Sequence, residues 1–449
     1  MDNIIKWLNN NNIQEVQCLT GDQNGISRGK ILPVDKFIED GGFRIAEGIL
    51  LQATCGDLID EDKLFTIIDP GDIDMVLKPD PDCCYVLPWL EKPTAMVIHN
   101  CFDQKGKTVE LSPRNILKKV IKLYQDKGWK AVVAPEMELY LTANCTDPNQ
   151  PLEPPKGKSG KPESGRQSFG IDAINEFSPI ITDVYDWCKQ QDLQIDVVVH
   201  EEGTAQLEFN FNHGDPLSLA DQVFVFKRTM KEAAIKHGCT ATFMAKPISG
   251  EPGSAMHIHQ SIVDIQTGKN IFNEADDKGM TDCFYHYIGG LQQYIPHVMP
   301  MFAPNVNSFR RFVAKQATPV NLLWGVENRT VGLRVPDAGG QARRVENRLP
   351  GSDANPYLAI AATLLCGYIG MMNKITPSEQ VQGKANKHKS TDLPLSIEEA
   401  ISNMANSDVI KEYLGSTFVE GYTETRIADY ENFKKVISAW ERDYLLTTV

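Results

Sequence analysis

The chain has 449 residues, enough for a large hydrophobic core and about two domains. Its 42% hydrophobic and 23% charged residues are ordinary for a globular protein, and the net charge of -14 argues against nucleic acid as a main partner. The ten cysteines are scattered, the N-terminus lacks a secretory signal, and the most apolar run, residues 357–372, is short for a membrane span. We therefore expect a cytoplasmic protein with reduced thiols and no membrane partner.

The first hundred residues have the pattern of a small α+β domain. We predict a helix near residues 4–11, strands at 15–20 and 31–34, and a strand-and-turn pattern through 69–88 with Pro-Gly and Pro-Asp punctuation. Ser112 and Pro113 then supply an N-cap and a first-turn proline for a helix. We place the domain boundary there, giving domains 1–110 and 111–449.

The second domain alternates strands and helices. We predict a strand at 131–141, a helix at 177–191, two short strands within 197–212, a helix at 217–237, a buried helix at 357–372 and a C-terminal helix around 431–444. Residues 146–167 form a polar stretch rich in Pro, Lys, Gly and Ser. Such a stretch is either disordered or an ordered functional loop.

Four predicted strands carry polar or ionisable side chains at alternate positions. Side chains of a strand alternate between its two faces, so each set projects from one face, and the other face is apolar. The sets are Glu136/Glu138, Gln206/Glu208/Asn210, His257/His259/Ser261 and Arg344/Glu346/Arg348. A solvated sheet face explains any one set. Together, acids, imidazoles and guanidiniums are typical of a site that holds metal ions and phosphate.

Local spacing around these strands leaves alternatives open. Gly203 can supply a turn that brings Glu201 and Glu208 together from adjacent strands, although a charged hairpin end has the same pattern. The arginine-rich strand could equally be a surface ion-pair ladder of little energetic value. Arg329 and Arg334 have opposite parity, so both can face one site only if a turn or bulge separates them.

At these residues the chain resembles the glutamine synthetase family, in its bacterial class I architecture, over nearly its whole length. Each motif alone is weak, but their order and spacing are specific. They are E-x-E from Glu136, H-E and Q-x-E from His200, K-P and G-S-x-M-H-x-H-Q-S from Lys246, N-S-x-x-R from Asn307, N-R-T from Asn328, R-R-x-E-x-R from Arg343 and A-N-P-Y from Ala354. Residues 207–262 look most similar to the γ-glutamylpolyamine synthetase branch, of which γ-glutamylputrescine synthetase is typical.

The resemblance implies an α+β fold, with a small N-terminal β-grasp-like domain and a catalytic domain built on a curved antiparallel sheet flanked by helices. It also implies a homo-oligomer, a dodecamer of two stacked hexameric rings with each active site shared between neighbours. The implied reaction has two steps: ATP phosphorylates the γ-carboxylate of L-glutamate, and an amine then displaces phosphate. Two metals and several arginines suit this chemistry, because they neutralise charge on the transferring phosphoryl group.

The resemblance also implies a role for individual residues. Two or more Mg²⁺ or Mn²⁺ ions would be held, one by Glu138, Glu201 and Glu208 and another by Glu136, His257 and Glu346. Gly253, Arg311 and Arg348 would bind glutamate, and His259, Ser261, Arg329 and Arg334 would contact ATP. The residues expected to take part in catalysis are Arg329, Arg334 and Arg344.

Two departures from the family pattern bear on the nitrogen donor. The acidic flap residue that helps take a proton from ammonium is replaced by Ala317, and the D-G-S-S ammonium motif is missing, with Asp57 its nearest counterpart. Loss of a carboxylate removes charge and opens volume, which favours a polyamine such as putrescine or a small alkylamine as acceptor. The alternatives are a true glutamine synthetase whose carboxylate has moved, to Asp57 or Glu327, and an inactive assembly protein of the same fold. Residues 387–393 read KHKSTDL, without the tyrosine that some bacterial relatives adenylylate.

Overall fold

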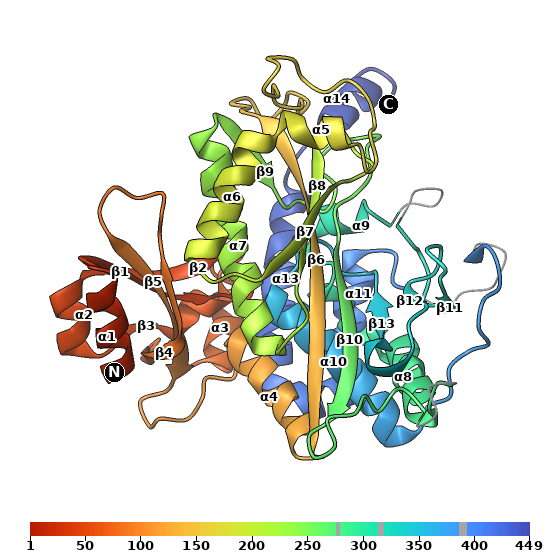
Figure 1. Ribbon diagram of the computed structural model, residues 1–449, viewed down its shortest axis with the longest axis horizontal. Helices are drawn as coiled ribbons and strands as arrows, with labels where there is room; N and C mark the ends of the chain where they lie inside the picture. The colour runs from red at the N-terminus through yellow and green to blue at the C-terminus, as the bar shows by residue number, and fades with distance from the viewer. Residues whose placement is uncertain (275–278, 313–317, 386–392) are drawn as a thin grey trace.

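Two separate β-sheets organise the protein, seen here in a computed structural model that describes residues 1–274, 279–312, 318–385 and 393–449 (Figure 1). The first sheet is built from the N-terminal part of the chain, drawn in red and orange, and the second from the strands at the centre of the view. This α+β arrangement confirms the predicted fold class.

The N-terminal sheet has five strands in the order β2-β1-β5-β4-β3. Its central pair, β1 and β5, is parallel, and its other pairs are antiparallel, as in a β-grasp-like fold. The strands are β1 Glu15–Gly21, β2 Ser27–Pro33, β3 Phe43–Ala46, β4 Asp74–Val86 and β5 Thr94–Phe102. The helices of this part are α1 Asp2–Asn10, α2 Val34–Asp40 and α3 Glu61–Ile67. Helix α1 forms because Ile4 and Leu8, four residues apart, are both buried in the core of this domain.

The second sheet has the strand order β11-β12-β13-β10-β6-β8-β7, and β9 pairs with the end of β6. All its pairs are antiparallel except β11 with β12. The strands are β6 Trp129–Ala143, β7 Ile195–His200, β8 Gln206–Phe211, β9 Cys239–Thr242, β10 Met256–Asp264, β11 Trp324–Val326, β12 Leu333–Val335 and β13 Val345–Asn347.

Helices cover the apolar face of this sheet. Helices α4 and α7 pack on β6, and α10 packs on β10 and against α4, α7 and α8. The helices are α4 Pro113–Gln125, α5 Ile171–Glu176, α6 Ser178–Gln190, α7 Pro216–Lys236, α8 Asp282–Val298, α9 Val306–Phe309, α10 Pro356–Asn373, α11 Ile397–Ala405, α12 Asp408–Leu414, α13 Ser416–Lys434 and α14 Ala439–Leu445. Helix α10 is long and apolar enough to cross a membrane, but 89% of it is buried inside the fold, as in a core helix.

The predicted elements are largely confirmed, with three corrections. Strand β2 begins at Ser27 rather than 31, and residues 74–86 form one long strand, β4, with an irregularity between Pro79 and Cys84. The single C-terminal helix is wrong: α13 ends at Lys434 and α14 begins at Ala439. A capping box between Ser438 and Glu441 starts the new helix, a signal that is present in the sequence.

The stretch 146–167 is a folded loop, closed by a bridge between Lys156 and Pro162. We retain 1–110 and 111–449 as proposed domains, because the first sheet ends at Phe102 and the helix that packs on the second sheet begins at Pro113.

Candidate functional site

Strand register places the predicted polar sets in one continuous row across the second sheet. On β6, Glu138 lies opposite Glu208 of β8, and Glu136 lies between Asn210 of β8 and His257 of β10. The row continues where His259 lies opposite Glu346 of β13, and Glu346 opposite Arg334 of β12. Directly paired residues share a face, so these side chains project to the same side. We call this set the charged row.

The opposite face is apolar and fully packed, as the alternation predicted. Met137, Leu207, Ile258 and Val345 each have no exposed surface. The helices therefore bury one face of the sheet, and this burial fixes the direction of the charged row. Residues of the row are themselves largely buried, since Glu138, Glu208, His257 and Glu346 each expose 8% or less of their surface.

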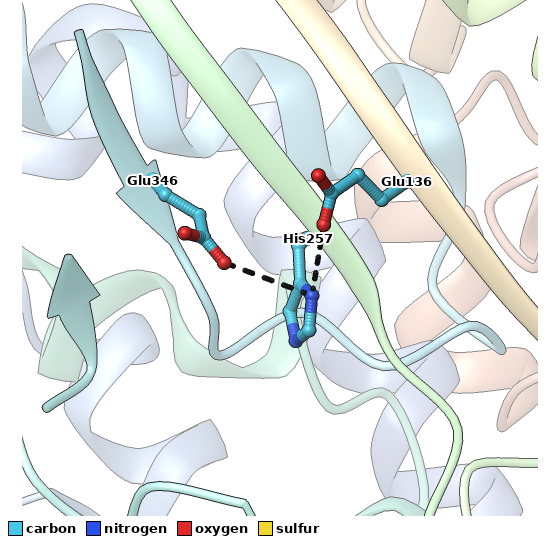
Figure 2. Close-up of side chains that lie close together, drawn as sticks. All are labelled: Glu136, His257 and Glu346. Atoms are coloured by element: carbon cyan, nitrogen blue, oxygen red, sulfur yellow. Dashed lines mark hydrogen bonds and ion pairs between the residues drawn. The ribbon is translucent and has the colours of Figure 1, made fainter. Parts of the chain in front are cut away.

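One group in the row joins Glu136, His257 and Glu346 from three adjacent strands (Figure 2). His257 Nδ1 lies 3.3 Å from Glu136 Oε2 and 3.8 Å from Glu346 Oε1. Burial by itself raises the pKa of Glu136, but the hydrogen bonds from His257 and His259 outweigh it and hold the pKa well below its usual range. Two ionised carboxylates and an imidazole within this distance are a ligand set for a divalent cation.

A second group joins Glu138, Glu208 and His257, whose ligand atoms lie within 4.8 Å of one another. Burial and the charge of Glu201 raise the pKa of Glu138 to about 8, and burial with the charges of Glu136 and Glu138 raises the pKa of Glu208 to about 10. These carboxyls are crowded, and the charges of Arg311 and Arg348 near Glu138 do not offset the burial and repulsion. Glu201 lies in the turn between β7 and β8 and is close enough to influence Glu138 and Glu208 electrostatically, so the hairpin predicted from Gly203 is present.

This arrangement fits divalent cations on its own chemistry. A cation between these carboxylates would offset the burial and the mutual repulsion that together raise the pKa values of Glu138 and Glu208. Oxygen ligands with one imidazole suit Mg²⁺ or Mn²⁺ better than a soft metal.

Arginines surround the first group on its β12–β13 side. Arg334 Nη1 donates to Glu346 Oε2 over 2.8 Å, and Arg348 Nη1 donates to Glu346 Oε1. Burial raises the pKa of Glu346, but the nearby Arg348 charge more than offsets this and lowers it to about 2. The Nε atoms of Arg334 and Arg348 are buried and have no hydrogen-bond partner among the described residues. Donors of this kind are available for an anionic substrate.

A cavity of about 290 Å³ opens beside the row, lined by Glu136, His259, Ser261 and Arg344 among others. Arg344 Nε donates to His259 Nδ1 over 3.2 Å, and His259 Nε2 lies 2.9 Å from Glu136 Oε1. The imidazole is therefore held by the arginine on one side and the acid on the other, with its proton on Nε2. His259 and Ser261, predicted to contact ATP, both line this cavity.

Gly253 and Arg311 are packed against each other. A Cβ at position 253 would lie 2.4 Å from Cγ of Arg311, so only glycine fits there. Arg311 exposes 1% of its surface and donates to the backbone oxygens of Arg348 and Leu349 at 2.8 Å each. Arg311 thus supports the backbone that carries Arg348, and its direct contact with glutamate stays a prediction.

The turn that the parity argument required between Arg329 and Arg334 is present. Strand β11 ends at Val326, Glu327 has φ of +48°, and β12 begins at Leu333. Arg329 is exposed in this turn and influences Glu201 electrostatically.

Of the two amine-pocket candidates, Asp57 is not part of the charged row. Asp57 is exposed, and its carboxylate contacts Cys55 and Asn432. Ala317 lies outside the described residues.

Two residues beside the hairpin that carries Glu201 were not predicted from the sequence. Glu163, in the loop 146–167, pairs with His200 at 3.0 Å. Phe169 has φ of +57°, exposes 63% of its surface, and its backbone N–H donates to the oxygen of His200 over 2.8 Å. An exposed aromatic residue with a strained backbone beside a charged site is a functional candidate, but a single sequence gives no signal for it.

The fold combines a β-grasp-like domain with a curved sheet that carries two carboxylate–imidazole groups, one of them flanked by arginines. These are features of a metal-dependent ligase that handles phosphate. The family model "Glutamine synthetase, catalytic domain" matches residues 110–445. The chain therefore belongs to the glutamine synthetase family, whose enzymes use ATP and divalent metals.

Several characterised relatives match nearly the whole chain. The glutamate–isopropylamine ligase of Pseudomonas sp is 31% identical over 443 residues, covering 97% of this chain and 95% of that protein. The γ-glutamylputrescine synthetase PuuA of Escherichia coli (strain K12) is 30% identical over 446 residues, covering 97% and 92%. A glutamine synthetase of Pyrococcus abyssi (strain GE5 / Orsay) is 31% identical over 442 residues, covering 94% and 92%.

Solved structures of GmaS have the same fold. GmaS without ligand matches with a TM-score of 0.84 at 25% identity, covering all of both chains. A GmaS complex with ADP matches with a TM-score of 0.85 at 25% identity, covering 99% of this chain and all of that one.

Proposed function

We propose that this protein is an ATP-dependent ligase that joins the γ-carboxylate of L-glutamate to an amine, a polyamine such as putrescine or a small alkylamine, through a γ-glutamyl phosphate. The observation that carries the proposal is the charged row, with its two acid-and-histidine groups and its unpaired arginine Nε atoms. Relatives named for isopropylamine and putrescine, both similar over 97% of the chain, support an amine as acceptor.

The residues of the charged row, together with Glu201 and the neighbouring arginines, would have distinct roles in this reaction. Glu136, His257 and Glu346 would hold one cation, and Glu138, Glu208 and Glu201 another; Mg²⁺ or Mn²⁺ bound there would supply positive charge against the phosphates. The guanidiniums of Arg334, Arg344 and Arg348 would orient the anionic substrates, and Arg329 could reach the same region from its exposed turn.

The amine side of the site is supported by two observations. The acid expected beside ammonium is replaced by Ala317, which leaves an uncharged position. Phe169, held by its backbone bond to His200, adds an exposed apolar surface beside the turn that carries Glu201. We infer that an alkyl group contacts Phe169, because apolar area removed from water stabilises binding.

An assay of ATP hydrolysis with a panel of amines tests the proposal. Phosphate release that requires glutamate, Mg²⁺ and an alkylamine or polyamine together, with ammonium a poor substrate, is the expected result. Ammonium used as well as any amine on the panel would contradict the proposed acceptor. Absence of turnover with every amine, while Mg-ATP still binds, would favour the inactive assembly protein.

A true glutamine synthetase remains the second candidate, since the P. abyssi enzyme is as similar as the amine ligases. A glutamine synthetase would need another acid in place of Ala317. The carboxylate of Glu327 is bound by Arg334 and by the N–H of Asp337 at 2.6 Å, and Asp57 is bound by Asn432. Ala317→Glu separates the candidates: it should improve ammonium use in an amine ligase and change little in a glutamine synthetase whose acid has moved.

We also propose that the protein assembles as a dodecamer in the cytoplasm. Helix α14 and the residues around it expose Ile437, Trp440, Tyr444 and Leu446 by 61% or more, an apolar surface suited to a second copy of the chain. The ten free cysteines suit a reducing compartment. The mass in solution tests the assembly, and a fully active monomer would contradict it.

A further inference from the structure

The folded loop 146–167 contacts the turn that carries Glu201, and the reaction proposed above gives this loop no role. The loop is anchored at two points in its middle, because the N–H of Ala143 donates to the oxygen of Glu153 and the N–H of Lys158 to the oxygen of Glu176, both over 2.8 Å. Its last residues extend over the β7–β8 turn and the loop 250–251. Two side chains, Glu163 and Arg166, make the contacts.

Glu163 holds the β7–β8 turn at two points. Its Oε2 accepts from the N–H of Ala205 over 2.6 Å and lies 3.0 Å from Nε2 of His200, whose Nδ1 lies 2.8 Å from the oxygen of Glu201. The pair is buried, with 11% of the Glu163 side chain and none of the His200 side chain exposed. Ala205 has φ of +55°, a left-handed conformation that a non-glycine residue adopts at a cost. The carboxylate of Glu163 therefore stabilises a strained turn.

Arg166 ties this turn to a second loop. Its Nη1 donates to Glu202 Oε1 over 3.2 Å, its Nη2 donates to the oxygen of Gly250 over 2.7 Å, and its Nε lies 3.4 Å from Glu251 Oε2. The side chain is 46% exposed, so the ion pairs alone contribute little. The role of Arg166 is to connect two segments, because its guanidinium joins the turn after Glu201 to the loop that leads to Gly253.

Side chains, rather than backbone pairing, hold the backbone amides of this turn. The N–H of Glu202 donates to Glu201, that of Gly203 to Gln206, that of Thr204 to Glu251 and that of Ala205 to Glu163. The turn also brings Glu201 toward the like charges of Glu138 and Glu208. When Glu138 and Glu208 lose their protons, as cation binding requires, their charges repel Glu201 and act to move it away.

We propose that Glu163 and Arg166 are positioning residues, which keep Glu201 beside Glu138 and Glu208 and so prepare the second cation group. This inference rests on the proposed function only in assigning a cation to that group. The contacts that hold the turn are independent of it.

Glu163→Ala tests the proposal in the full-length protein, with Mn²⁺ binding followed by electron paramagnetic resonance and amide exchange followed by mass spectrometry. The variant should bind Mn²⁺ at one of two sites about tenfold more weakly, as for the loss of a partner that supports a metal ligand. Exchange of the amides of 202–205 should be at least about tenfold faster even without metal. Glu163→Gln keeps an oxygen acceptor for Ala205 and His200 and should stay within about threefold of the wild type.

Two further variants complete the test. Lys161→Ala, an exposed position in the same loop, is the matched control and should leave both readouts unchanged. Arg166→Ala changes an exposed residue and serves as the test if Glu163→Ala does not fold. In this variant the backbone amides of 202–205 and of 250–251 should both exchange faster. Unchanged exchange and Mn²⁺ affinity in Glu163→Ala, or in Arg166→Ala, would overturn the proposal. A wild type that binds no Mn²⁺ would instead overturn the proposed function, while the exchange readout would still decide the role of Glu163.

Discussion

Lys30 of β2 and Asp74 of β4, two charged residues of the first sheet, are exposed, whereas Glu138, Glu208 and Glu346 of the second sheet are buried. Both sheets obey the same alternation of side chains, so alternation does not explain the difference. An exposed charge keeps its hydration, but a buried one loses it and needs a partner. Burial of the charged side chains, rather than their presence on a strand, therefore distinguishes the functional face of the second sheet.

A buried charge can also be structural, and the junction of the two sheets offers the test. Arg114 of α4 contacts Asp80 of β4 at 2.9 Å and Asp221 of α7 at 2.7 Å, with 3% of its side chain exposed. Arg114→Ala removes the ion pair of Asp221 and leaves Asp80 with Lys118, at 3.7 Å, as its partner. The free energy of unfolding, measured by denaturant unfolding, should fall by about 3–5 kcal/mol. Lys122→Ala, which removes an exposed ion pair with Asp126, is the control and should change stability little.

Breaking the charged row should remove activity. Glu346→Gln removes a charge between His257, Arg334 and Arg348, and kcat should fall by about 100- to 1000-fold because the substrate phosphates lose their positioned neighbours. Asp74→Asn, an exposed acid on the first sheet, should leave kcat unchanged. Equal loss in both variants would show that the contrast between the sheets is wrong.

Cation binding by the row should depend on pH, whereas the described residues of the first sheet hold no group of three acid or imidazole ligand atoms within 4.8 Å of one another. Burial raises the pKa of Glu138 to about 8 and that of Glu208 further, so the metal-free site retains protons that a cation must displace. Mg²⁺ affinity should therefore rise with pH between 7 and 9, by up to about tenfold per unit for each proton released. Calorimetry in two buffers of different ionisation enthalpy measures these protons, and a buffer-independent enthalpy would contradict the expectation.

The raised pKa of Glu138 also predicts how the stability of the metal-free protein depends on pH. The carboxyl of Glu138 titrates at about 4.5 when unfolded and at about 8 when folded, so the unfolded chain loses its proton first as the pH rises. With a chelator present, the free energy of unfolding should therefore decrease as the pH rises from about 4.5 to about 8, and added Mg²⁺ should restore it. Thermal unfolding across the range checks this, and a metal-free protein that becomes more stable with rising pH would contradict it.

The smallest expected effect concerns the apolar surface beside the row. Phe169→Ala should raise KM for the alkylamine about fivefold and leave KM for ATP unchanged, because only the alkyl group loses contact area. Ile171→Ala, which alters another exposed apolar residue two positions later, is the control. Equal changes in the two variants would show that Phe169 is simply part of the surface.

Much of the fold followed from local pattern. Alternation in residues 131–141 and 256–261 predicted both the strands and their polar faces, and helical spacing predicted α7 and α10. The C-terminal helix was misjudged because an apolar pattern continues across the break at residues 435–438. The pairing of Glu163 with His200 had no signal, since it joins a loop to a strand 37 residues away through side chains alone.

The sequence by itself determined which residue types lie on which face of each strand, because the side-chain period of a strand is local. It also determined the family, through motifs that stay in order along the chain. Only the tertiary structure decided that Glu346 lies opposite His259, although 87 residues separate them, since their register follows from helices burying the other face of the sheet. It also decided that Arg311 is buried beneath Gly253, because packing at such a distance depends on the whole fold.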